Sequence, residues 1–226
     1  GVSGQLTQSN GYGFENLVLQ NVAGSGTGQQ GAAIYAEYTN ATTVPTWIRI
    51  RNLNIEIASG ADEWSHGIRL EGGTAADQPL RNVWIDNCRI AIGANGSAAI
   101  RLVNIGNAFI RATQQSGTNS NLEITGSAGA LSSSIDIEGL GGATMALDFA
   151  QNVRAFGGPW TTVTTTANTA TATLMLGAIT NTPSAPTGSN VMIGAFMSAL
   201  GRYAFITPSG SVMEFRTNGL NGRNGT

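Results

Sequence analysis

The sequence predicts an all-β protein: a right-handed parallel β-helix followed by a small antiparallel β C-terminal module. Glycine makes up 31 of the 226 residues, and charged residues only 11%, a composition typical of many short strands and turns. Apolar and polar residues alternate in short runs, as in half-buried strands. These runs recur at intervals of about 33 residues, as in the coils of a solenoid. Right-handed winding is expected because parallel crossovers close in that sense.

Composition and charge exclude several classes of protein. The net charge is −2 and all 11 basic residues are arginine, so a nucleic-acid binder that works through a positive field is not expected. No run of 18 apolar residues is present, so membrane insertion is not expected. Cys88 is the only cysteine, which leaves no intrachain disulfide. The chain lacks a starting Met and a leader-like segment, and we expect a processed product or part of a longer polypeptide.

A small residue followed by isoleucine begins the first repeated strand pattern. Its four copies are spaced by 34, 32 and 35 residues. Because side chains alternate between the two faces of a strand, the isoleucines should point inward and the residue after each should face solvent. The spacing predicts about four or five coils over residues 14–155. The predicted inward column contains Ile34, Ile68, Ile100 and Ile135.

The second repeated pattern is apolar-x-apolar-x-Asn. Its copies end at Asn21, Asn52 and Asn87, with a degenerate copy that ends at Gly126. We expect these asparagines to turn the chain and to hydrogen-bond to one another along the stack, as identical polar side chains do in stacked strands. The second predicted inward column contains Leu19, Ile50, Ile85 and Ile124.

The same alternation predicts side chains that meet on the outer surface. Strands of adjacent coils lie about 4.8 Å apart, so Arg51 should lie beside Asp86, and Arg49 beside Trp84. Two interpretations are open. These contacts are surface ion pairs and cation–π pairs worth under ~1 kcal/mol each, or they form a polar and aromatic face for sugars.

The composition changes after Gly158, where a threonine-rich alternating segment begins. Such a segment favours strands, and a loop rich in proline and glycine follows it. We therefore predict two domains, residues 1–158 as the parallel β-helix and residues 159–226 as the C-terminal module. Within the module, strands are expected at 191–196, 202–207 and 211–216.

Two segments carry a resemblance to known families. Residues 80–90 (LRNVWIDNCRI) resemble the pectin-lyase-like right-handed β-helix, and residues 203–216 (YAFITPSGSVMEFR) are similar to the C-terminal strands of bacteriophage tail fibres and tailspikes. The resemblance implies a homotrimer in the virion tail, outside the cell, that recognises host-surface polysaccharide and in many members cleaves it. It also implies contact with other tail proteins through an N-terminal part that this chain lacks.

Two alternatives to a tailspike stay open. A secreted polysaccharide-degrading enzyme has the same fold, and so does a non-catalytic stalk of a virion or adhesin. No cofactor is expected, because neither a P-loop nor a dinucleotide-binding motif is present. No metal site is expected, since the only histidine, His66, has no second histidine or cysteine near it in the sequence.

If the protein is an enzyme, we expect a glycoside hydrolase that uses paired carboxylates. A lyase is less favoured. It would need a basic residue to remove the proton next to a uronate carboxylate, and without lysine only an arginine could do so. The segment 61–66 holds two acidic residues, a tryptophan and the only histidine. It is either a carbohydrate-binding loop or a solvated turn with Trp64 packed on a neighbouring subunit. The candidate catalytic residues are Asp62, Glu63, Glu71 and Asp77.

The candidate substrate-binding residues are aromatic or basic. An aromatic ring can stack on a sugar ring, and a guanidinium can form charge-assisted hydrogen bonds with an acidic sugar. The set consists of Trp64, Arg69, Arg101, Trp84 and Tyr35.

Overall fold

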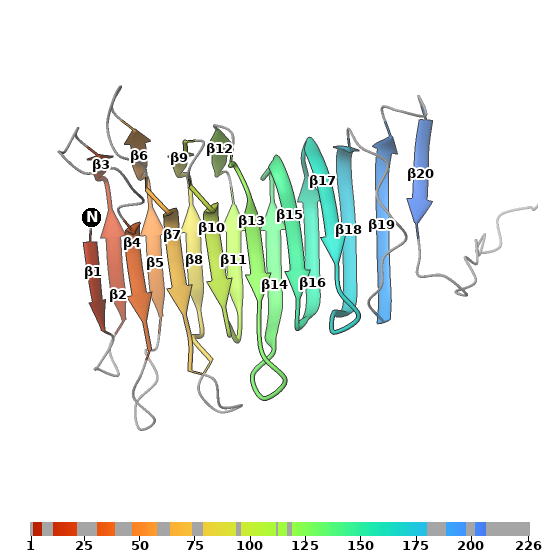
Figure 1. The fold of residues 1–226 in the computed structure, drawn as a ribbon, viewed down its shortest axis with the longest axis horizontal. Helices are drawn as coiled ribbons and strands as arrows, with labels where there is room; N and C mark the ends of the chain where they lie inside the picture. Colours follow the sequence, from red (N-terminus) through yellow and green to blue (C-terminus); the bar gives the residue numbers. More distant parts are fainter. Residues whose placement is uncertain are drawn as a thin grey trace, which may run out of the picture.

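The fold is a stack of β-strand coils. A computed structural model describes residues 2–5, 11–21, 31–38, 47–57, 64–73, 79–93, 96–111, 113–116, 119–179, 189–197 and 202–206. Within these ranges the regular secondary structure is entirely β, and no helix long and apolar enough to span a bilayer is found. Figure 1 shows the strands side by side along the long axis, from β1 at one end to β20 at the other.

Three parallel sheets form the walls of the stack. The first sheet contains β1 (Val2–Gln5), β4 (Ala32–Glu37), β7 (His66–Glu71), β10 (Ala98–Val103), β13 (Leu122–Thr125), β15 (Gly142–Asp148) and β17 (Trp160–Thr165). The second sheet contains β2 (Tyr12–Glu15), β5 (Ile48–Arg51), β8 (Val83–Asp86), β11 (Ala108–Arg111), β14 (Ser132–Glu138), β16 (Ala150–Gly157), β18 (Ala170–Ile179) and β19 (Ser189–Met197). The third sheet contains β3 (Val18–Asn21), β6 (Asn54–Ile57), β9 (Arg89–Ala91) and β12 (Gln114–Ser116). A pairing of Trp160 in β17 with Ile179 in β18 joins the first two sheets at one end.

The chain visits the sheets in turn, so each strand pairs with the strand one coil earlier. This order confirms the predicted β-helix-like solenoid; its handedness stays a prediction. After β12 the coils lose their third strand and become shorter. The advance from Ile34 to Ile68 is 34 residues, whereas that from Met145 to Val163 is 18. Over residues 14–155 the second sheet contributes six strands, β2 to β16. Five coil advances separate the first of these strands from the last, in agreement with the predicted four or five coils.

Stacked aliphatic side chains form the core between the sheets, as the alternation predicted, but three members of the predicted columns were wrong. Ile34, Ile68 and Ile100 are in register and fully buried, and the next residue in that column is Leu122. Ile135 lies in β14 of the second sheet, opposite Ala108. The coil after β10 is shorter than the earlier ones, so β13 is the strand that pairs with β10 in the first sheet. Corrected for this, the column of the second sheet contains Phe14, Ile50, Ile85, Ile110 and Ile137.

The other two corrections concern the first and fourth copies of the Asn pattern. Leu19 lies in β3 of the third sheet, opposite Ile55, and Ile124 lies in the first sheet, opposite Leu102. Both residues follow the expected alternation in a strand of another sheet. Their wall was wrongly assigned because alternation alone does not distinguish the walls.

An asparagine ladder turns the chain after β2, β5 and β8. Asn16, Asn52 and Asn87 have φ values of 57°, 53° and 51°, the left-handed conformation that asparagine tolerates better than most residues. Asn87 Nδ2 donates to Asn52 Oδ1 at 2.8 Å, and Asn52 Nδ2 donates to Asn16 Oδ1 at 2.9 Å. The predicted ladder is confirmed for Asn52 and Asn87; its third member is Asn16, because Asn21 ends β3 in another sheet.

Parallel stacking continues past residue 158. β17 pairs with β15, β18 with β16 and β19 with β18, all in parallel. Trp160 and Leu174 are fully buried in the same core as the earlier coils. Among the described strands after residue 158, the expected antiparallel pairing is found only between β19 and β20 (Arg202–Ile206), because threonine-rich alternation suits a parallel coil equally well.

Some predictions for the C-terminal part remain untested. The strand expected at 211–216 lies outside the described residues. The division of the chain at residue 158 stays a prediction, as does the separate C-terminal module.

Candidate functional site

The outer face of the second sheet carries aromatic and charged side chains in register. Arg49, Trp84 and Phe109 form one column across β5, β8 and β11, and the next column contains Arg51, Asp86 and Arg111. Inward positions on these strands are fully or almost fully buried, so the alternation directs these six side chains outward. Together they line a surface hollow of about 300 Å³.

Two tryptophans flank Arg49 at one end of this hollow. The guanidinium carbon lies 5.7 Å from the ring centre of Trp47 and 5.6 Å from that of Trp84, which is within cation–π range. Trp47 lies against Gly11, where a Cβ would come within 1.9 Å of the indole. The glycine thus leaves space for this ring. Both tryptophans remain more than a third exposed, at 38% and 36%.

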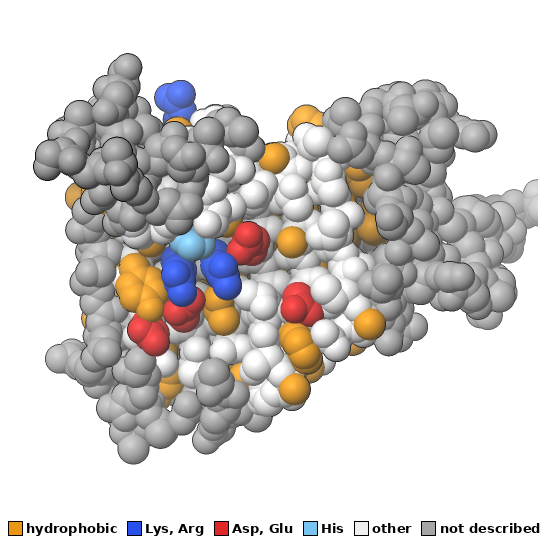
Figure 2. All heavy atoms as spheres, viewed as in Figure 1, with side chains coloured by type: hydrophobic (Ala, Val, Ile, Leu, Met, Phe, Trp, Pro, Cys, Tyr) orange, Lys and Arg blue, Asp and Glu red, His pale blue; other side chains and the backbone are white. Residues whose placement is uncertain are grey.

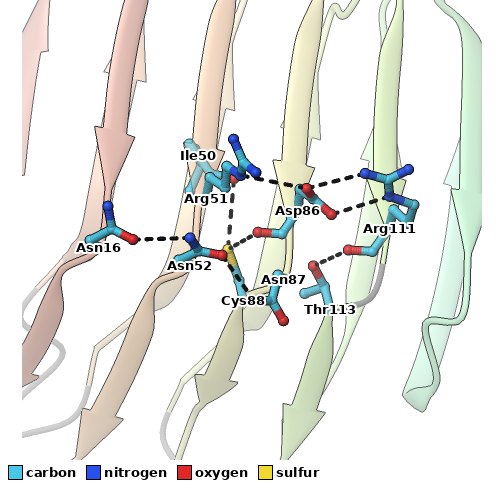
Figure 3. Close-up of polar contacts among 9 residues, drawn as sticks. All are labelled: Asn16, Ile50, Arg51, Asn52, Asp86, Asn87, Cys88, Arg111 and Thr113. Atoms are coloured by element: carbon cyan, nitrogen blue, oxygen red, sulfur yellow. Dashed lines mark hydrogen bonds and ion pairs between the residues drawn. The ribbon is translucent and has the colours of Figure 1, made fainter.

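Asp86 lies between two arginines in the neighbouring column (Figure 3). Arg111 donates to its two carboxylate oxygens at 3.2 and 3.3 Å, and Arg51 approaches to 3.9 Å. The Arg111 guanidinium also lies 5.6 Å from the ring centre of Phe109. The hollow therefore offers aromatic rings, guanidinium donors and a carboxylate acceptor within one small area.

Two further hollows adjoin the first. A hollow of about 370 Å³ shares Trp84 and Phe109 with it and is also lined by Asp136. A third hollow, of about 700 Å³, shares Asn82 and Asn107 with the second and is also lined by Arg81. We call the three hollows together the second-sheet groove. Because neighbouring hollows share lining residues, the groove is extended rather than a single compact cavity.

The outer face of the first sheet holds a second polar cluster. The Tyr35 hydroxyl donates to Oε2 of Glu37 at 2.7 Å and lies 3.2 Å from Oε2 of Glu71. Arg69 contacts Oε1 of Glu71 at 2.7 and 2.6 Å, and its guanidinium lies 5.4 Å from the Tyr35 ring centre. Desolvation, followed by the hydrogen bond to Glu37, raises the pKa of Tyr35. Figure 2 shows a gathering of acidic, basic and hydrophobic side chains on this face.

A buried histidine lies beside this cluster. His66 is 5% exposed and its Nδ1 lies 3.1 Å from the Ser65 hydroxyl. Burial, and then the charges of Arg69 and Arg101, lower the pKa of His66 to about 4. Arg101 in turn pairs with Glu123 at 3.3 Å. Among the described residues, no three His, Cys, Asp or Glu side chains converge as metal ligands would.

The sequence-predicted site residues are divided between two sheets. Tyr35, Arg69, Glu71 and Arg101 lie together on the first sheet, at neighbouring register positions, whereas Trp84 lies on the second. Trp64 does not line the second-sheet groove, and the placement of the three remaining acids is not described. Trp64 is buried, with 6% exposure, and Asp62, Glu63 and Asp77 lie outside the described residues.

The groove residues Phe109, Arg111 and Arg81 were missed in the sequence, as was Trp47, which lies beside Arg49. Trp47 precedes its strand and so falls outside the alternating run. Residues 108–111 repeat the apolar-x-apolar alternation, but Ala112 replaces the terminal asparagine of the pattern. The alternation alone, without the asparagine, was the signal that could have revealed Phe109 and Arg111.

Comparison of the chain with protein-family models, with curated proteins and with solved structures finds no match.

Proposed function

We propose that this protein binds a polysaccharide along the second-sheet groove. The observation that carries the proposal is the pair of exposed Trp84 and half-buried Phe109 at neighbouring register positions, with arginine and aspartate side chains beside them in the same hollow. Aromatic rings provide flat apolar surfaces for sugar rings, and a few convergent polar groups fix a ligand's orientation. The guanidinium groups donate to sugar oxygens, and Asp86 accepts from hydroxyl groups.

The extended form of the groove favours a polymer over a single sugar. Its hollows share residues from one to the next, so successive sugars of one chain meet successive parts of the same surface. Strands in register repeat every ~4.8 Å, which is comparable to the length of one sugar unit in an extended polysaccharide. The repeating coils therefore supply repeating contacts.

The resemblance of residues 203–216 to phage tail fibres and tailspikes, together with that of residues 80–90 to the pectin-lyase-like β-helix, supports a role in host attachment. In this proposal the chain is part of a bacteriophage tailspike or tail fibre, and the polysaccharide is on the host surface. A non-catalytic stalk would present the same coils but would not bind sugar through Trp84.

Binding by the full chain to an array of bacterial surface polysaccharides tests the proposal. Trp84→Ala should weaken binding by about tenfold or more, since the loss of a central aromatic contact typically costs over ~1 kcal/mol. The matched control is Phe156→Ala, which removes a 49% exposed ring of the same sheet that does not line the groove. Equal affinity of the Trp84 variant and wild type, or no binding to any glycan, would contradict the proposal.

Glycoside hydrolysis is a second candidate function, favoured by Glu37 and Glu71. Their carboxylates contact one hydroxyl oxygen at 2.7 and 3.2 Å, so they lie close enough together to permit the separation of about 5–5.5 Å found in retaining glycosidases. Arg69 pairs with Glu71 and, among the described ion pairs, none involves Glu37. The two carboxyl groups thus have different surroundings, as an acid and a nucleophile require.

The release of reducing ends from the bound polysaccharide tests this second function. Glu71→Gln should abolish product formation while binding through the groove continues, and Glu123→Gln serves as the matched control on the same face. Binding without products from the wild-type protein would leave a recognition protein only. Products that persist in the Glu71 variant would place catalysis elsewhere.

A further inference from the structure

We infer that the second-sheet groove selects an anionic polysaccharide, with Arg49 and Arg81 as the residues that recognise the acidic groups. The inference rests on the proposed function and adds the chemical class of the ligand. The expected ligand is a polymer whose sugars carry a carboxylate or a sulfate group.

The charge of the groove is opposite to that of the chain. Four arginines and two aspartates line the three hollows, which gives the groove a net charge of +2, whereas the whole chain carries −2. In a protein with only 11% charged residues, such a local excess produces a positive field confined to one surface. A field of this sign attracts anionic ligands and repels cationic ones.

Both aspartates of the groove are already paired. Arg111 contacts both carboxylate oxygens of Asp86, and Arg154 donates to both oxygens of Asp136 at 2.7 Å. Their charges are therefore largely compensated within the protein. Arg51 and Arg111 share the single carboxylate of Asp86, whereas Arg49 and Arg81 have no carboxylate partner among the described residues.

Arg49 is the better placed of the two to bind an anion. The rings of Trp47 and Trp84 flank its guanidinium and restrict its position. Ring faces attract the positive charge but provide few strong acceptors for the five N–H donors. A planar carboxylate, or the oxygens of a sulfate, would provide them in the paired geometry that guanidinium favours. The indoles on either side would contact the sugar ring that carries the acid.

An acidic polysaccharide is favoured over a nucleic acid, which is also an anionic polymer that stacks on aromatic rings. A nucleic-acid site requires many phosphate contacts, and its proteins are strongly basic. This chain has a pI near 5.3, and two of the groove arginines lack a carboxylate partner among the described residues. A sugar chain with one acid per repeat matches this sparse charge.

The test compares affinities of the full chain for polymers that differ in charge. The probes are hyaluronate and alginate, which carry carboxylates, dextran sulfate, carboxyl-reduced hyaluronate, uncharged dextran and oligodeoxythymidine. The inference expects binding to a carboxylated or sulfated polymer, at least tenfold weaker binding to the uncharged ones, and weaker binding as salt is raised. Preference between the carboxylated and sulfated polymers identifies the acidic group.

Two substitutions make the test specific to the groove. Arg49→Gln should weaken binding of the preferred polymer by about tenfold or more, the cost of losing a charged hydrogen bond, and Arg81→Gln should weaken it to a smaller extent. The matched control is Arg89→Gln, on an exposed position of the third sheet, which should bind like wild type. Thermal unfolding of each variant verifies that it is folded.

Three results would overturn the inference. Equal affinity for charged and uncharged polymers would show a neutral ligand and leave the proposed function intact. Tighter binding to oligodeoxythymidine than to every sugar polymer would indicate a nucleic-acid site instead. No binding to any polymer would overturn both the inference and the proposed function.

Discussion

At the residue scale, the ladder asparagines and His66 show how the role of a side chain depends on its neighbours in other coils. The ladder asparagines adopt a left-handed backbone and also join consecutive coils through their amides. His66 fills a buried position at the start of β7, beside the arginines of the first sheet. Both roles depend on neighbours from other coils, so they could not be assigned from the local sequence.

The ladder predicts a measurable difference between two substitutions at Asn52. Asn52→Gly keeps the left-handed backbone without strain but loses the amide hydrogen bonds. Asn52→Ala loses the same bonds and also places an alanine at φ 53°, which costs about 1 kcal/mol more. Urea unfolding should therefore show the alanine variant as the less stable by about 1 kcal/mol. If the glycine variant is as unstable as the alanine variant, the backbone contributes nothing there.

The lowered pKa of His66 predicts a loss of stability in acid. Its pKa is about 4 in the folded protein and 6.5 in the unfolded chain, so between these values the unfolded state binds more protons. Glu71 opposes the shift, but burial and the two arginines outweigh it. Stability present above pH 6.5 should decline as the pH falls toward 4, by an amount on the order of 3 kcal/mol.

Urea unfolding at pH 7 and pH 4.5 measures this effect, with His66→Gln as the control. The glutamine variant should lose less stability on acidification than wild type, because its side chain takes up no proton. The same pH dependence in both proteins would show that other groups cause the acid sensitivity.

At the scale of the strands, alternation determined which side chains point inward and which outward. It correctly predicted that Ile34, Ile68 and Ile100 stack, and that Arg49 lies beside Trp84 and Arg51 beside Asp86. The period was less informative, because the coils shorten once the third strand is lost. Ile135 follows Ile100 by almost one early coil length, yet β13 and Leu122 intervene.

The stack of isoleucines predicts a large effect of charge in the core. Ile68 is fully buried between Ile34 and Ile100, so Ile68→Asp buries a carboxylate without a partner. We expect this substitution to cost more than about 4 kcal/mol and to unfold the early coils. Val18→Asp, at a position that is 68% exposed, should retain cooperative thermal unfolding. Similar melting of the two variants would contradict the assigned column.

At the scale of the whole molecule, repetition turns local contacts into extended surfaces. Each coil contacts only its neighbours, yet the outward positions of successive coils form one groove on the second sheet and one polar cluster on the first. The sequence located part of each: it gave the contacts of Arg49 with Trp84 and of Arg51 with Asp86 as one possible face for sugars, and residues 61–66 as a separate candidate binding loop. The groove and the polar cluster are separate because β7 and β8 belong to different sheets, which residue spacing does not reveal.

The resemblance to tailspikes predicts a homotrimer in solution. Sedimentation equilibrium of the full chain should give three times the 23.2 kDa mass of one chain, independent of moderate dilution. A monomer over the whole concentration range would contradict this assembly and favour a secreted enzyme or a single-chain binding protein.

The position of a bound sugar tests the central claim most directly. A crystal structure of the protein with a uronic-acid oligosaccharide from its preferred polymer would show that position. The account predicts a sugar ring over Trp84, next to Phe109, with its acidic group on Arg49. An oligosaccharide bound to the first sheet over Tyr35 and Glu71, with the second-sheet groove free of sugar, would contradict it.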